Sequence, residues 1–316
     1  MAVYTPVAPD ELAAFLDHYD LGALTGCQGI SDGIENTNYF VTTSRGRYVL
    51  TLFESIGYAD LPYYLELMAF LAEHGVPSAH PLADRGGGYL RTLKNRPAAL
   101  VQRLDGASVD DPDLEHCRAI GAALAHLHRQ GRHFTGRRAN TRGPRWWRQT
   151  ADQVLPHLDA GRASLLRDEL DHQSRHRNAG LPRGVIHADL FRDNALFTGH
   201  RLTGIIDFYY ACNDVLLFDL AVTVNDWCRQ PDGSLMADKA LAILNEYHRQ
   251  RPLQKHEGTF WPVLLRAAAL RFWLSRLKDQ LFPRPGELTR IKDPGEFERI
   301  LRWHRERGGD GMAGWV

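Results

Sequence analysis

The residues of this chain best suited to chemistry lie between two apolar segments. The first segment, Leu181–Ile186, leads into a loop that carries Asp189 and Asn194, and the second, Leu202–Ile206, ends at Asp207. Phosphoryl transfer requires such a set: Asp189 can accept the proton of an attacking hydroxyl, while Asn194 and Asp207 offer oxygen ligands to Mg²⁺. A lone Asp or Asn in a loop more often forms a local turn, but the strand-like flanks favour the catalytic interpretation.

A second segment, Gly29–Asn38, comes just before a predicted strand. Backbone N–H groups of a Gly-containing hairpin can approach phosphates, because glycine has no side chain to obstruct them. The segment does not match G-x-G-x-x-G, so its place at the head of a β-rich region is what favours phosphate binding over a plain loop. The residues predicted to bind the nucleotide here are Ser31, Gly33, Asn36, Thr37 and Asn38.

Composition limits the classes of protein to consider. The 316 residues are 44% hydrophobic, enough for two lobes, and the 38 basic residues balance the 38 acidic ones. No charge excess indicates binding to nucleic acid or a membrane. The N-terminus lacks the features of a secretory signal, and the cysteines form no C-x-x-C pair. We therefore expect a cytoplasmic protein with free thiols, whose oligomeric state stays open.

The spacing of apolar residues predicts a β-rich region over residues 1–104. It contains a helix at Pro9–Leu21 and a second helix that begins after Asp60 and ends at Gly75. The predicted strands are Asn38–Thr43, Arg47–Phe53, Tyr89–Thr92 and Ala98–Leu104, with a turn at Lys94 and Asn95 between the last two.

Residues 105–316 are predicted to be mainly helical. An apolar stripe follows Asp113 and ends at Gly131, one or two helices are expected within 137–183, and further helices are predicted at Phe218–Trp227, Leu235–Arg249 and Thr259–Leu281. The fold class is therefore α+β in two lobes, with a hinge near Asp105 and a cleft beneath it.

The order H-x-D-x-x-x-x-N followed by I-D-F resembles the catalytic loop and metal-binding turn of the protein-kinase-like superfamily. Ala188 after His187, and the lack of a glycine after Phe208, resemble its aminoglycoside-phosphotransferase-like branch. The resemblance implies a two-lobed fold that uses ATP and Mg²⁺. It also implies structural roles for His187 and Asp219 in the catalytic loop, and an adenine site at the hinge residues Gln102, Arg103 and Leu104.

The strand that carries a phosphate-binding lysine in protein kinases has Thr51 at the matching position, and Glu66 matches the acid that pairs with that lysine. A threonine supplies no positive charge, so phosphate neutralisation would rest on Mg²⁺ and on donors of the loop. Thr51 also motivates an alternative, a nucleotide-binding pseudokinase. The presence of Asp189, Asn194 and Asp207 together argues against it.

Six stretches resemble the bacterial homoserine kinases of this branch: Gly33–Tyr39, Tyr48–Glu54, Pro97–Leu100, Val185–Asn194, Ile206–Asp214 and Arg266–Leu277. The resemblance implies ATP-dependent phosphorylation of the side-chain hydroxyl of L-homoserine in threonine biosynthesis. An amino-acid acceptor needs a cation for its carboxylate, and Arg271 or Arg276 could supply a planar guanidinium. An ordinary surface ion pair explains either arginine equally well.

Asn213 is a weaker candidate for contacting the ammonium group of the acceptor. The remaining alternative is another small-molecule kinase of the same fold, acting on an amino alcohol, a sugar or an aminoglycoside. Such enzymes favour an aromatic cage or an acidic groove, and neither stands out in this sequence.

Overall fold

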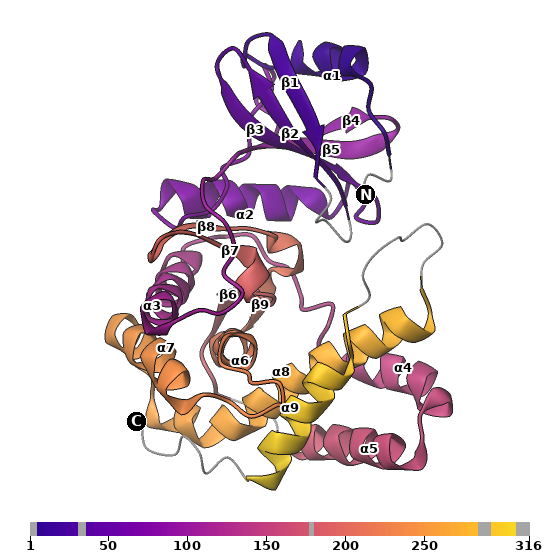
Figure 1. The fold of residues 1–316 in the computed structure, drawn as a ribbon, viewed down its shortest axis with the longest axis vertical. Helices are drawn as coiled ribbons and strands as arrows, with labels where there is room; N and C mark the ends of the chain where they lie inside the picture. Colours follow the sequence, from indigo (N-terminus) through magenta and orange to yellow (C-terminus); the bar gives the residue numbers. More distant parts are fainter. Residues whose placement is uncertain (1–4, 31–35, 177–179, 284–291, 308–316) are drawn as a thin grey trace. The chain divides into compact units, whose positions relative to one another are not determined.

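The computed structural model describes residues 5–30, 36–176, 180–283 and 292–307 (Figure 1). These residues form two compact units, one reaching Asp105 and the other beginning at Gly106. In the described part of the chain, no helix is both long and apolar enough to cross a bilayer. The four cysteines, all described, are free.

The N-terminal unit is built on an antiparallel five-stranded sheet. The strand order is β1-β2-β3-β5-β4, with β1 Leu24–Gly29, β2 Asn36–Thr43, β3 Gly46–Phe53, β4 Arg91–Leu93 and β5 Arg96–Gln102. The predicted turn between the last two is confirmed: Lys94 and Asn95 both have positive φ, as a tight two-residue hairpin requires. Strand β1 was not predicted, because most of its side chains are exposed and it shows no apolar alternation.

Two helices accompany this sheet. In α1 (Pro9–Leu16), Leu12, Phe15 and Leu16 pack with β2 and β3 in one core cluster. The helix ends at Leu16 rather than at the predicted Leu21, although Tyr19 continues the buried stripe, since burial alone does not fix where a helix ends. Helix α2 (Leu61–Glu73) has Pro62 in its first turn and is followed by Gly75 with φ of 79°.

The C-terminal unit is mainly helical and holds two small antiparallel sheets, β6 with β9 and β7 with β8. The helices are α3 Leu114–Gly131, α4 Pro144–Val154, α5 Ala160–Arg175, α6 Leu216–Trp227, α7 Ala237–Gln250, α8 Lys255–Leu281 and α9 Gly295–Glu306. The strands are β6 Arg183–Ile186, β7 Ala195–Thr198, β8 Arg201–Ile205 and β9 Cys212–Val215.

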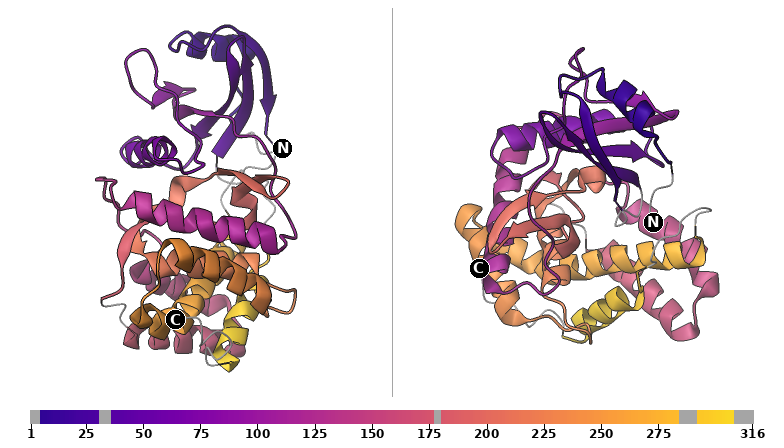
Figure 2. Two further views of the ribbon diagram at one scale, coloured as in Figure 1. Left: turned by 90° about the vertical axis from the view of Figure 1, so that its left-hand side faces the viewer. Right: turned by 45° about the horizontal axis from the view of Figure 1, so that its top comes forward.

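Helix α6 is the centre of this unit and is seen end-on in Figure 1. All of its residues are buried, including Asp219, Asn225 and Asp226, which hydrogen-bond to neighbouring segments. Figure 2 shows α3 and α7 running next to each other. Their close approach depends on Gly121, where an added Cβ would lie 2.4 Å from the carbonyl oxygen of Ile243. Around this frame, α8 packs against both α6 and α9.

Candidate active site

The predicted catalytic loop begins directly after β6 and is held by the first turn of α6. The carboxylate of Asp219 accepts hydrogen bonds from the backbone N–H groups of His187 and Ala188, each at 2.7 Å. Ala188 has φ of 64°, a left-handed conformation that costs a non-glycine residue energy and persists only where its surroundings enforce it. Asp219 therefore fixes the bend that leads to Asp189.

Asp219 is itself oriented by two buried side chains. Nε2 of His128 lies 3.1 Å from its carboxylate, and Nδ1 of His128 lies 2.7 Å from the hydroxyl of Tyr247. Burial lowers the pKa of His128, so the neutral ring donates from Nε2 to Asp219 and accepts from Tyr247. Burial, the largest single influence, raises the pKa of Asp219, but the hydrogen bond from His128, together with the other interactions of His128 and His187, holds that pKa below its ordinary value.

The histidine of the motif connects the two predicted loops. Burial lowers the pKa of His187, and the neutral ring donates from Nε2 to the carbonyl oxygen of Ile206 at 2.9 Å. The ring also packs against Phe208, with 4.6 Å between centroids. Because Ile206 and Phe208 flank Asp207, His187 positions the second acid relative to the loop that carries the first.

Asn194 joins the same arrangement from the other end of the loop. Its Nδ2 donates to the backbone carbonyl of Asp189 at 2.9 Å and to the Asp189 carboxylate at 3.3 Å. Its backbone carbonyl accepts from the N–H of Ile206 at 3.0 Å. Sequence positions 189, 194 and 207 are thus brought together, and the amide nitrogen of Asn194 orients the carboxylate predicted to act as the base.

The carboxyl group of Asp189 has a strongly shifted pKa. Burial raises its pKa to about 8; Arg271 opposes that rise, while Asp207 and Asp193 add to it. Nη1 of Arg271 lies 3.9 Å from Oδ1 of Asp189. Several acids that repel one another's charge in a partly enclosed site are the setting in which a cation is stabilising.

The donors present fit Mg²⁺, which prefers carboxylate and amide oxygens. Asp207 is exposed and lies between β8 and the short helix Phe208–Tyr210. Its backbone is in the left-handed region, with φ of 61° and ψ of 57°. Aspartate tolerates this conformation better than most residues. Asn194 uses its amide nitrogen toward Asp189, which leaves its amide oxygen as the atom suited to a cation.

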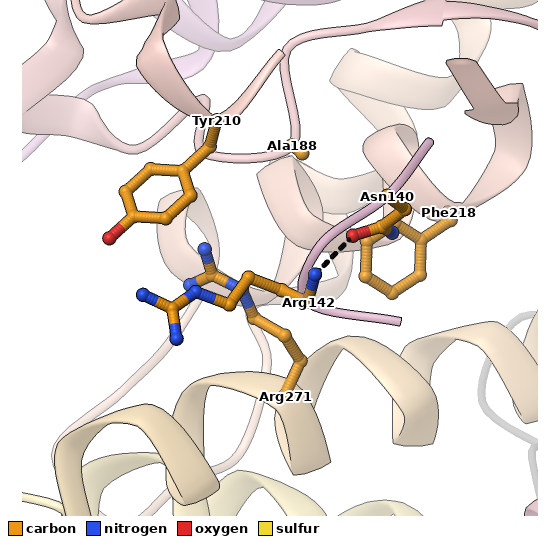
Figure 3. A pocket seen from close by; sticks show the side chains of 6 residues that line it. All are labelled: Asn140, Arg142, Ala188, Tyr210, Phe218 and Arg271. Carbon is orange, nitrogen blue, oxygen red and sulfur yellow. Dashed lines mark hydrogen bonds between the residues drawn. The ribbon is translucent and has the colours of Figure 1, made fainter. Parts of the chain in front are cut away.

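A small hollow opens beside the catalytic loop. Its lining combines two guanidinium groups with an amide, a phenol and two apolar side chains (Figure 3). The lining residues are Asn140, Arg142, Ala188, Tyr210, Phe218 and Arg271. Only Arg271 among them was predicted from the sequence.

The other residues predicted to bind the acceptor have structural partners. Arg276 is buried and bonds to the carbonyl of Asp293 and to the carboxylate of Glu296 at the start of α9. Oδ1 of Asn213 accepts from the backbone N–H of Arg138 at 2.8 Å, and its own N–H donates to the Arg138 carbonyl at 2.7 Å. The structure thus places Arg271 at the hollow, and neither Arg276 nor Asn213 lines it.

Of the residues predicted to bind nucleotide in the N-terminal unit, Ser31 and Gly33 lie outside the described residues. Asn36 and Thr37 are buried in β2, and Thr37 donates to the carboxylate of Glu54 at 2.7 Å. The Thr37 side chain therefore supports the sheet, whereas Oδ1 of Asn36 is buried without a hydrogen-bond partner in the described part of the chain.

Thr51, at the strand position where protein kinases carry a phosphate-binding lysine, pairs with another neutral side chain. Oγ1 of Thr51 donates to Oδ1 of Asn38 at 2.8 Å, across the paired strands β3 and β2. A threonine is thus accommodated here by bonding to the neighbouring strand.

The remaining nucleotide-binding predictions concern α2 and the end of β5. Glu66 is exposed on α2. The N–H groups of Gln102 and Arg103 donate within the same unit, to the carbonyls of His80 at 2.8 Å and Arg47 at 3.3 Å. Those two N–H groups are therefore already hydrogen-bonded inside the unit. Leu104, the third predicted hinge residue, is the next residue of the chain.

Another group of side chains in the described part of the chain could present three metal ligands: Asp113, His116 and His200. Asp113 caps α3, accepts from the N–H of His116 and lies 2.7 and 2.8 Å from the two imidazole rings. These contacts explain the cluster as a helix cap.

Comparison with known proteins agrees with this geometry. Residues 26–253 match the sequence model of the phosphotransferase enzyme family. The chain is 49% identical over 316 residues to the homoserine kinase of Methylobacillus flagellatus, covering 100% of this chain and 99% of that protein.

Two solved structures share the fold at low identity. The microcompartment-associated aminopropanol kinase has a TM-score of 0.72 at 19% identity, covering 97% of this chain and 99% of that one. Amicoumacin kinase hAmiN, in complex with AMP-PNP, Ca²⁺ and Ami, has a TM-score of 0.69 at 15% identity, covering 96% and 94%. These likenesses confirm the predicted α+β, protein-kinase-like fold class. The chain belongs to the phosphotransferase enzyme family.

Proposed function

We propose that this enzyme transfers the γ-phosphoryl group of ATP to the side-chain hydroxyl of L-homoserine, giving O-phospho-L-homoserine and ADP. The observation that carries the proposal is that the catalytic loop brings Asp189, Asn194 and Asp207 close together. Arg271 lies beside Asp189, the proposed base. The homoserine kinase of Methylobacillus flagellatus, 49% identical along the whole chain, supports the choice of acceptor.

In this proposal Asp189 accepts the proton of the homoserine hydroxyl as the oxygen attacks the γ-phosphorus, and ADP leaves. Asn194 and Asp207 would hold Mg²⁺, which would supply neutralisation of the phosphate charge. Asn194 holds the Asp189 carboxylate through Nδ2, and Asp219 fixes the bend at Ala188 that precedes it. These groups supply positioning and charge, which are the main requirements of phosphoryl transfer.

The use of ATP is supported by the family and by the AMP-PNP-bound amicoumacin kinase of the same fold. For the N-terminal unit, we propose that Asn38 and Thr51 contact the phosphates of ATP as a neutral pair. We also propose that the backbone near Leu104 contacts the adenine ring. Five other residues remain candidates for nucleotide binding because of the family resemblance: Ser31, Gly33, Glu66, Gln102 and Arg103. Because Thr51 carries no charge, the metal would supply the main neutralisation of the phosphates.

The acceptor must carry a group that suits a cationic hollow. Arg142 and Arg271 both line it, and Arg271 lies 3.9 Å from the base. A carboxylate matches a guanidinium, whereas a polycationic aminoglycoside or a cationic amino alcohol would be repelled by two arginines. We therefore assign the acceptor carboxylate to Arg271 rather than to Arg276, which is paired with Glu296.

The test is to identify the product of the full-length protein with ATP, Mg²⁺ and L-homoserine by ³¹P NMR. We expect a phosphomonoester signal that coincides with added O-phospho-L-homoserine and appears in step with ADP. A reaction lacking MgCl₂ and containing a chelator is the control. ADP release without that phosphomonoester, or at the same rate without homoserine, would contradict the proposed acceptor.

A further inference from the structure

Arg142 shares the hollow with Arg271, and nothing in the catalytic loop requires it there. Both guanidinium groups reach toward the ring of Tyr210, with their central carbons 5.5 and 4.9 Å from its centroid (Figure 3). Arg142 also lies over the ring of Trp146 at 4.7 Å. Aromatic faces attract guanidinium groups but do not neutralise them, so two positive charges face one small space.

The two guanidinium groups differ in their ion pairing. Nη1 of Arg271 lies 3.9 Å from Oδ1 of Asp189. None of the carboxylates in the described ranges forms an ion pair with Arg142, whose backbone N–H, by contrast, donates to Asn140. Like charges brought together repel, and a shared anion relieves that repulsion. The hollow therefore favours a small anion over a cation.

The segment that carries Arg142 is fixed by hydrogen bonds to β9. Asn213 bonds to both the N–H and the carbonyl of Arg138, at 2.8 and 2.7 Å. Nδ2 of Asn140 donates to Asp214 at 2.8 Å, and Oδ1 of Asn140 accepts from the N–H of Arg142 at 2.8 Å. Asn213, predicted to touch the acceptor itself, instead helps to position a residue that faces the hollow.

We propose that Arg142 and Arg271 together form the binding site for the carboxylate of the acceptor, and that Arg142 determines specificity for acceptors that carry one. This inference rests on the proposed function. In an extended homoserine, roughly 5 Å separate the hydroxyl oxygen from the carboxyl carbon, given C–C bonds of about 1.5 Å. That length suits an acceptor whose hydroxyl meets Asp189 while its carboxylate lies between the two guanidinium groups.

The test compares two acceptors in the full-length enzyme with saturating MgATP: L-homoserine and its carboxylate-free analogue 2-amino-1,4-butanediol. Arg142→Met is expected to raise the KM for homoserine about 10- to 100-fold, the usual effect of losing a hydrogen-bonded charge. The kcat, the KM for ATP and the KM for the diol should change less than about threefold. Arg142→Lys should reproduce most of the loss, because an ammonium cannot make the bidentate contact.

Arg145→Met is the matched control, since Arg145 is exposed on α4 and does not line the hollow. It should leave both KM values unchanged. Thermal unfolding of each variant checks the fold, and Arg142→Lys keeps the test decisive if the Met variant is unstable.

Three outcomes would overturn the inference. An unchanged homoserine KM in both Arg142 variants would show that Arg142 does not bind the acceptor. An equal loss of kcat with both acceptors would mean that the arginine acts on the phosphoryl group. Wild-type enzyme that does not phosphorylate homoserine would refute the proposed function, and this inference with it.

Discussion

Asp189→Asn is expected to lower kcat for phosphoryl transfer by about two to four orders of magnitude, the usual scale for removing a general base. The amide cannot accept the hydroxyl proton, yet it has nearly the same shape, so the bend at Ala188 and its bonds to Asp219 should persist. Affinity for MgATP should stay close to that of wild type. A coupled assay of ADP release, with ATP binding measured separately by calorimetry, checks both statements.

Asp193→Asn is the matched control for this substitution. Asp193 lies in the same loop but is exposed and paired with Lys292 at 2.6 Å. Its loss should change kcat by no more than a few-fold. If Asp189→Asn turned over at a rate similar to wild type, the assignment of Asp189 as the base would be wrong.

The same variant has a consequence for stability that depends on pH. Burial raises the pKa of Asp189 to about 8 from 3.8, so the folded protein binds this proton more tightly than the unfolded chain. The resulting stability is complete below about pH 4 and is lost as pH rises toward 8. In the presence of a chelator, Asp189→Asn should therefore unfold at a higher denaturant concentration than wild type at pH 9, by on the order of 1–3 kcal/mol, with little difference at pH 4. An equal effect at both pH values would argue against a buried, destabilised carboxylate.

Asp207→Ala is expected to weaken Mg²⁺-dependent ATP binding by at least about 100-fold and to reduce turnover below detection. The reason is that Asp207 would hold the Mg²⁺ that neutralises the phosphate charge, and Thr51 has no positive charge that could replace it. Asp207 is exposed, so removing its side chain leaves no cavity, and the fold should survive. Titration of ATP with and without MgCl₂ measures the effect.

The control for Asp207 is Asp171→Ala, which removes an exposed acid of α5 that is paired with Arg175. It should bind MgATP like the wild type. An Asp207→Ala protein that kept its Mg²⁺-dependent ATP affinity would show that the metal is held elsewhere.

The local patterns of the sequence were enough to predict most of the frame. Three predicted features depend on short-range patterns and are present in the structure: the apolar segments around Asp189 and Asp207, the turn at Lys94 and Asn95, and the helix at Phe218–Trp227. Helix α9 was not predicted although its spacing of Phe297, Ile300 and Leu301 marks one buried face. The apolar spacing that marks this helix was therefore present in the sequence.

The parts that could not be predicted depend on contacts between distant segments. Arg142 reaches the hollow only because Asn213 and Asp214 bind the chain near Arg138, more than seventy residues earlier in sequence, and no local pattern records that pairing. His128 likewise meets Asp219 through the packing of α3 with α6. Arg276 shows the reverse case. It lies on the same helix as Arg271 but bonds to Glu296, and no local pattern could tell which of the two arginines faces the hollow.

The central claim is tested most directly by comparing kcat/KM for L-homoserine with that for 3-amino-1-propanol, in the same enzyme at saturating MgATP. The amino alcohol has a hydroxyl and an ammonium group but no carboxylate, so it cannot use Arg271. We predict that homoserine is preferred by about 100-fold or more, the discrimination expected when a site built for a charged group is left unpaired. Equal kcat/KM values for the two acceptors would contradict the account.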